Sequence, residues 1–165
     1  MSFTATATNQ SLPVFNGVDG TGTPAVYKPR LADVNGPAFS NIAEVAVFPA
    51  RQTLKAVAAL PANWDGFDSD APSGEAVGRA FQLLVDLYRQ STSCIHAKWV
   101  NPHVSASEHG EVVFEWWKRD RKLTIYVGAD KTEFLRVGGP NIDSDMFDGE
   151  LVGTQFVGLW LWLNA

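Results

Sequence analysis

The stretch EVVFEWWKR (residues 111–119), followed by KLTIYVG (122–128) and TEFLRVGG (132–139), decides the fold of this chain. Apolar and polar residues alternate with period two in all three runs, and β-branched and aromatic residues are enriched, as in strands that bury one face. A charged tight connection at residues 118–121 and a four-residue loop at 128–131 separate the runs. Both have hairpin length, so the pattern predicts an antiparallel meander.

Alternation gives each predicted strand two faces. We expect the core face to carry Val112, Phe114, Trp116, Leu123, Ile125, Val127, Leu135 and Val137. The second face then carries the aromatic residues Trp117, Tyr126 and Phe134, ringed by the charged residues Glu115, Lys122 and Arg136. Clustered exposed aromatic residues with a charged rim have the composition of a protein-binding hot spot, although a helix or the N-terminal arm could also cover this face.

Composition limits the class of protein. A chain of 165 residues that is 45% hydrophobic is expected to form one domain with a substantial core. Its net charge is −5, and the longest basic cluster is the short run at 118–122, which argues against nucleic-acid binding. A single cysteine, Cys94, excludes an internal disulfide and fits a reducing compartment. No signal peptide or long apolar run is visible, so we expect a cytoplasmic protein without membrane contact.

The helices are predicted from apolar spacing and capping residues, within an α+β domain at residues 41–165. Residues 1–40 are interpreted as an irregular arm, with a partner-binding extension left open. We expect a short strand or turn up to Phe48, then a helix from about Pro49 to Leu60. A second helix runs from an N-cap at Ser73 to about Gln90, with an apolar stripe of Val77, Phe81, Leu84 and Tyr88.

The remaining segments are less regular. Residues 95–104 are predicted to be extended and could join the meander, because a proline biases its predecessor toward β. Residues 138–149 are interpreted as a loop. The run 154–163 fits a helical stripe of Phe156, Leu159, Trp160 and Leu163 as well as a strand, and we favour a short terminal helix. The predicted fold is therefore a meander of three to four strands packed against two or three helices.

Several of these motifs together resemble a common group of small bacterial and phage proteins. They are LPANWDG (60–66), a Pro72-Ser73 helix start, Gly110 before VVFEWW, the KLTIYVG strand and FDGEL (147–151). The resemblance covers about residues 50–163, and the Trp64-Asp65-Gly66 loop is its distinctive part. It implies an α+β fold, a closing helix and a bacterial or phage origin. The group has no assigned activity, so no catalytic residue carries over.

The acidic loop after the first predicted helix suggests calcium binding, because Asp65, Asp68, Asp70 and Glu75 lie close in sequence. A regular calcium loop requires oxygen ligands at its first, third and fifth positions, and Phe67 occupies the third position from Asp65. A turn-forming acidic loop held to the body of the protein by Trp64 is the better interpretation. The acids Asp143, Asp145 and Asp148 fail the same spacing test, and we expect no bound metal or cofactor.

Two further arrangements have residue types that occur in catalytic sites. Cys94 with His96, His103 or His109 could form a thiol–imidazole pair, but a lone apolar cysteine is more often a packing residue. Glu111 and Glu115 share a strand face about 13 Å apart, which is too far for a pair of catalytic carboxylates. Cross-strand charge pairs with Lys122 and Arg136 are the simpler account of the glutamates.

These observations favour a non-enzymatic protein that acts by covering a surface of another protein. An inhibitor of a host defence complex, of the anti-CRISPR kind, would be an instance in a phage or mobile element. An antitoxin or immunity protein is an alternative within the same class. A small enzyme that uses the acidic loop from Asp65 to Glu75 is the alternative from a different class. A sheet face rich in aromatic residues also permits a homodimer.

Overall fold

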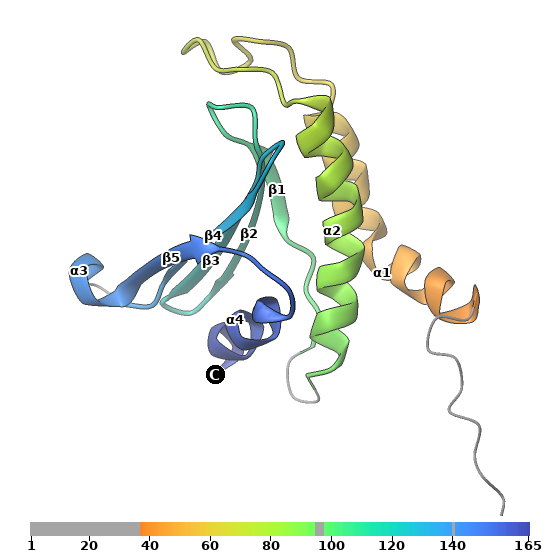
Figure 1. Cartoon of the computed structure of the whole chain (residues 1–165), viewed down its shortest axis with the longest axis vertical. Helices are drawn as coiled ribbons and strands as arrows, with labels where there is room; N and C mark the ends of the chain where they lie inside the picture. Colours follow the sequence, from red (N-terminus) through yellow and green to blue (C-terminus); the bar gives the residue numbers. More distant parts are fainter. Residues whose placement is uncertain (1–36, 95–97, 140) are drawn as a thin grey trace, which may run out of the picture. The chain divides into compact units, whose positions relative to one another are not determined.

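Within the described residues, five antiparallel strands form one sheet with neighbours in the order β1-β2-β3-β4-β5, and three helices of ten or more residues and one single helical turn accompany it in this α+β fold (Figure 1). The computed structural model describes residues 37–94, 98–139 and 141–165, all within the unit Asp33–Ala165. The elements are α1 (Pro37–Val57), α2 (Gly74–Thr92), β1 (His103–Ala106), β2 (Val112–Lys118), β3 (Arg121–Val127), β4 (Thr132–Val137), the single turn α3 (Ile142–Asp145), β5 (Met146–Glu150) and α4 (Gln155–Asn164).

One face of the sheet carries the hydrophobic core. Helices α2 and α4 contact the central strands β2 and β3, and α1 packs against α2 and the edge strand β1 (Figure 1). The six core residues predicted on β2 and β3 are all buried, which confirms their assigned phase. Their partners from the helices include Leu54, Leu84, Leu87, Phe156 and Trp160.

The phase predicted for β4 is wrong. Val127 pairs with Thr132 and Ile125 pairs with Phe134, so Phe134 shares the core face and is only 2% exposed. Leu135 pairs with Thr124 and lies on the second face, where it is partly buried, as is Val137. Phe134, Leu135 and Val137 are all apolar, so composition does not decide which of them faces the core. The four-residue loop at 128–131 decides it, because the loop places residues 127 and 132 opposite each other.

The sheet has a fifth strand where a loop was predicted. β5 pairs antiparallel with β4, and Gly149 lies opposite Phe134. A Cβ atom at Gly149 would come within 3.3 Å of the Phe134 ring, so a larger residue there would fit only if the ring moved by a few tenths of an ångström. Gly and Asp are depleted in strands, and the sequence MFDGE therefore lacks a strand signal of its own. Residues 95–97 lie outside the described residues, while β1 confirms that the end of the 95–104 segment joins the sheet.

Helix α1 begins at Pro37 and contains Pro49 in its interior, so the short strand or turn predicted up to Phe48 is wrong. Its buried stripe is Ala43, Val47, Ala50, Leu54 and Val57, with spacings of four and three residues. Two members are alanines, which carry a weak hydrophobic signal. Pro49 has no N–H to donate to the carbonyl of Val45, four residues earlier, and the next carbonyl, that of Ala46, accepts from Asn101 Nδ2 (3.0 Å). Burial of the stripe outweighs the cost of an interior proline.

The other two helices are confirmed. Ser73 caps α2 through its Oγ, which accepts from the Ala76 N–H at 3.1 Å. The buried side of α2 is centred on Ala76, Ala80, Leu84 and Leu87, while Val77, Phe81 and Tyr88 of the predicted stripe flank it. In α4 the buried residues are the predicted Phe156, Leu159, Trp160 and Leu163.

The loop between α1 and α2 is held against the β1–β2 hairpin. The Asp70 N–H donates to the Glu108 carbonyl (2.9 Å) and the Ser73 N–H to the Gly110 carbonyl (3.1 Å). Gly110 has φ +73°, and a Cβ atom there would lie 2.7 Å from the Ala71 carbonyl oxygen. This close approach explains why a glycine precedes the β2 strand.

Gly110→Ala should therefore destabilise the fold by about 2 kcal/mol or more, because it adds both an unfavourable φ and a backbone clash. Gly78→Ala is the matched control, since Gly78 lies in α2 with open space around it. This variant should gain about 0.5–1 kcal/mol from helix propensity. Urea unfolding of both variants measures the difference, and an equal effect of the two substitutions would contradict the packing described for Gly110.

The phase of β4 can be tested with neighbouring residues. Phe134→Ala should lower the free energy of unfolding by about 3–5 kcal/mol, as for a large core side chain. Leu135→Ala should cost less than half as much, because this side chain stays partly exposed on the second face. Denaturant unfolding measures both values. A larger loss in the free energy of unfolding for Leu135→Ala than for Phe134→Ala would contradict the observed register and support the one expected from the sequence.

Candidate functional site

The second face of the sheet carries three rows of side chains that run across the strands. Helices α2 and α4 lie on the other face, against β2 and β3 (Figure 1). Strand pairing defines the rows as Trp117–Lys122–Val137–Met146, His103–Glu115–Thr124–Leu135–Asp148 and Ser105–Val113–Tyr126–Glu133–Glu150. We call these three rows the open face. It is aromatic and basic at the end of β2 and acidic toward β5.

Trp117 is the most prominent side chain of the open face, with 55% of its surface exposed. The Lys122 ammonium lies 5.4 Å from its ring centroid, and the His103 ring lies 5.8 Å away. Glu115 holds both neighbours, because its carboxylate is 2.5 Å from Lys122 Nζ and 3.7 Å from His103 Nδ1. The buried Thr124 hydroxyl also donates to this carboxylate (3.4 Å). The exposed indole therefore has preorganised polar neighbours on both sides.

A groove of about 540 Å³ adjoins Trp117 at the β1–β2 edge. Buried Trp116, Trp160 and Leu163 contribute apolar surface to its lining. Lys118 lies in its wall, where its ammonium donates to Asn164 Oδ1 at 2.9 Å. The other lining residues are Lys98, Val100, Asn101, His103, Glu115, Trp117 and Asn164. A recess with apolar walls beside an exposed tryptophan can accept a side chain from a partner.

The structure brings together four of the six predicted partner-binding residues. Trp117, Tyr126, Glu115 and Lys122 lie on the open face, and the expected cross-strand pair between Glu115 and Lys122 forms. The other two residues, Phe134 and Arg136, lie on the helix-covered face.

The surroundings of Arg136 explain its position on the covered face. Its guanidinium lies 5.0 Å from the Phe147 ring centroid and 5.2 Å from that of Trp162. It therefore links β5 to α4 and does not pair with the glutamates of the open face. Among the residues of that face that sequence analysis missed are His103, Leu135, Val137 and Met146. Pairing registers taken from the predicted hairpin loops would have identified Leu135 and Val137.

The acidic loop from Asp65 to Glu75 has a structural role for its first carboxylate. Asp65 Oδ1 accepts from the Phe67 N–H (2.9 Å), and Oδ2 accepts from the Ser69 hydroxyl (2.5 Å). These bonds, led by that from Ser69, lower the pKa of Asp65 below 3.8. Trp64 is partly buried, as expected for a residue that anchors the loop. Within the described residues, no group of three His, Cys, Asp or Glu side chains could hold a metal ion.

The candidate thiol–imidazole pair is divided between two environments. Cys94 is buried in the hydrophobic core at the end of α2. His103 is exposed on the open face, and His109 is exposed in the β1–β2 turn beside Glu108. His96 lies outside the described residues. Packing accounts for the position of Cys94.

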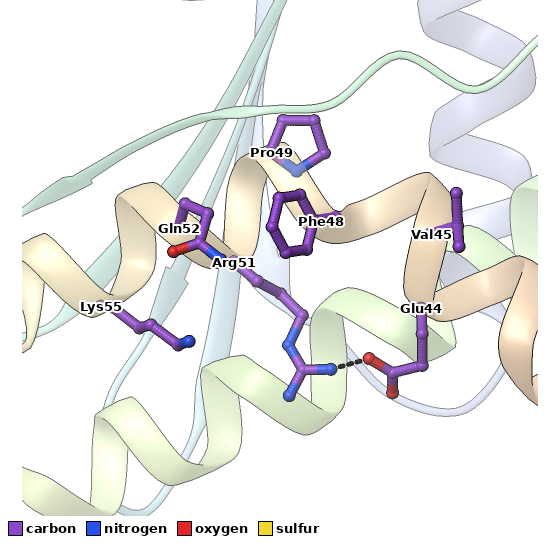
Figure 2. A pocket seen from close by; sticks show the side chains of 7 residues that line it. All are labelled: Glu44, Val45, Phe48, Pro49, Arg51, Gln52 and Lys55. Carbon is purple, nitrogen blue, oxygen red and sulfur yellow. Dashed lines mark ion pairs between the residues drawn. The ribbon is translucent and has the colours of Figure 1, made fainter.

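The outer side of α1 is a further apolar surface, with a shallow hollow of about 650 Å³ around Phe48 and Pro49 (Figure 2). Val45 is 75% exposed, and Phe48 is 57% exposed. Glu44 and Arg51 form an ion pair within the helix at its border (Figure 2). All the residues that line this hollow come from one helix, whereas the open face combines five strands.

The fold and these surfaces define an α+β protein whose antiparallel sheet is covered by helices on one face and presents a mixed aromatic and charged surface on the other. No family model, curated protein or solved structure matches the chain. Among the helices of residues 37–94, 98–139 and 141–165, none is both long and apolar enough to cross a membrane.

The role of Ser69 in the acidic loop gives a pH-dependent prediction. Ser69→Ala should raise the pKa of Asp65 toward 3.8, because the strongest hydrogen bond to the carboxylate is lost. A lowered folded-state pKa stabilises the fold above pH 3.8, and this contribution is lost as the pH falls through the folded pKa. The difference in the free energy of unfolding between the wild type and the variant should therefore become smaller in acid. NMR titration of the Asp65 carboxyl carbon checks the shift, and an identical titration in both proteins would contradict it.

Proposed function

We propose that this chain is a non-enzymatic protein-binding protein that recognises a partner in the cytoplasm through the open face. The observation that carries this proposal is the exposure of Trp117 between Lys122 and His103, beside the groove at the β1–β2 edge. Tryptophan is enriched in interface hot spots, and energetic anchors commonly lie beside pockets. Exposing more than half of an indole side chain has a hydration cost that a partner would remove.

The support from Glu115 strengthens the proposal. Its side chain is 16% exposed and contacts both Lys122 and His103, the two neighbours of Trp117, so few of its side-chain rotations remain to be restricted on binding. A preorganised contact loses less conformational entropy in a complex than a flexible one. An inhibitor of a host defence complex and an antitoxin or immunity protein are both instances of this class. In the acidic loop, the Asp65 carboxylate accepts hydrogen bonds from Phe67 and Ser69 within the loop itself. This structural role does not favour the alternative of a small enzyme.

The proposal is tested by affinity capture from a lysate of the source cell with tagged wild type, Trp117→Ala and Phe67→Ala. Phe67 is the matched control, because it is an aromatic residue that is 87% exposed and lies in the α1–α2 loop. Trp117→Ala should weaken binding to the captured partner at least about tenfold, or 1.4 kcal/mol, while Phe67→Ala binds as the wild type does.

A melting temperature measured for each variant separates binding from folding. Trp117→Ala should melt within a few degrees of the wild type, whereas Trp116→Ala, which removes a core side chain, should lose about 3–5 kcal/mol. Unchanged partner binding by Trp117→Ala would overturn the proposal. An equally large loss of stability in both tryptophan variants would show that the Trp117 side chain belongs to the packed core.

A further inference from the structure

The two edges of the sheet differ in how they are protected. At one edge, α1 packs against β1. At the other edge, β5 has no strand on its outer side within the described residues, and four of its five residues are exposed. An uncovered edge presents backbone N–H and C=O groups that can pair with another extended chain.

The hydrogen bonds next to β5 show which of its residues point outward. The Gly138 N–H donates to the Asp145 carbonyl (3.0 Å), and the Leu151 N–H donates to the Thr132 carbonyl (2.8 Å). Antiparallel pairs alternate between hydrogen-bonded and non-hydrogen-bonded positions. Odd-numbered residues of β5 therefore bond to β4, and the outward backbone groups belong to Met146, Asp148 and Glu150.

The side chains of these three residues lie on the open face, at the ends of its three rows. Asp148 and Glu150 form no ion pair with another described residue, and the neighbouring Glu133 is paired with Lys131 (2.8 Å). Glu133, and more weakly Glu150, raise the pKa of Lys131, which reflects the acidic character of this corner. An added strand would thus meet two carboxylates on one face, and Phe147, which is 54% exposed, on the other.

This charge pattern disfavours a second copy of the chain in the registers that bring the acidic residues of two β5 strands opposite each other. Pairing β5 with its own copy about a two-fold axis at Asp148 would place the two Asp148 carboxylates opposite each other. Moving the axis to Gly149 would place Asp148 opposite Glu150. Like charges directly opposite in a sheet are destabilising.

We propose that the outer edge of β5 binds an extended, basic segment of another protein by strand addition, with Lys or Arg at alternate positions facing Asp148 and Glu150. Backbone bonds to Met146, Asp148 and Glu150 would supply affinity, and alternate side chains would supply specificity, as in other complexes formed by strand addition. This inference does not depend on the role of Trp117, which lies three strands away on β2.

The test uses the full-length protein and two blocked peptides of nine residues, one alternating Lys with Val and the other alternating Glu with Val. With the Lys peptide at about 1 mM, amide exchange at Met146, Asp148 and Glu150 should slow at least about tenfold. The Glu peptide should have no effect, and added salt should weaken the effect of the Lys peptide. An absence of protection, or equal protection by both peptides, would overturn the proposal.

Two substitutions at one position separate charge from backbone bonding. Asp148→Asn removes only the charge, whereas Asp148→Pro also removes the outward N–H and should leave the bonds to β4 in place. Both should bind the Lys peptide more weakly than the wild type, and the proline variant should bind at least about threefold more weakly than the asparagine variant. Equal binding by the two variants would refute strand addition. Concentration-dependent protection of the same amides without peptide would instead identify a second copy as the occupant.

Discussion

The packing of Trp116 is the contact on which the rest of the structure depends. Its ring lies 5.9 Å from those of Phe156 and Trp160 in α4 and 6.0 Å from that of Trp99, while Nε1 donates to the Val100 carbonyl at 2.8 Å. The Trp116 side chain thus joins strand β2, helix α4 and the segment that leads into β1. Since successive side chains of a strand point to opposite faces, burying Trp116 directs Trp117 outward. The core and the open face are consequences of the same alternation.

The parts of the fold that the sequence predicts are those where local pattern and tertiary packing agree. Strands β2 and β3 alternate clearly, and Ser73 marks the start of α2 through a hydrogen bond that is local in sequence. The phase of β4 was mispredicted because Phe134 competes with Leu135 and Val137 for the core. The hairpin loop contained the missing information, since a one-residue change of register exchanges the two faces of a strand.

The rest of the fold depends on contacts that no local pattern shows. Helix α1 continues through Pro49 because a stripe containing Ala43 and Ala50 is buried against α2 and the sheet, and small side chains give a weak periodic signal. Strand β5 forms because β4 offers it an edge and because Gly149 leaves room for Phe134. Neither segment has the composition of the element it forms. Tertiary packing overrides local propensity in both.

The candidate surfaces also depend on contacts between distant parts of the chain. Alternation identified Trp117, Glu115 and Lys122 as neighbours, but exposure depends on where the helices pack, and residues far along the chain decide that. Helices α1, α2 and α4 contribute buried side chains to one core, and the other face has contacts between its own side chains, such as that of Glu115 with Lys122. An antiparallel sheet can present one face without helices. On the open face Val113 and Thr124 are buried near the middle, whereas the exposed side chains lie toward the ends, at Trp117 and along β5. Its aromatic end beside the groove and its acidic end at β5 are therefore separate regions of one face, and the two proposed contacts do not share residues.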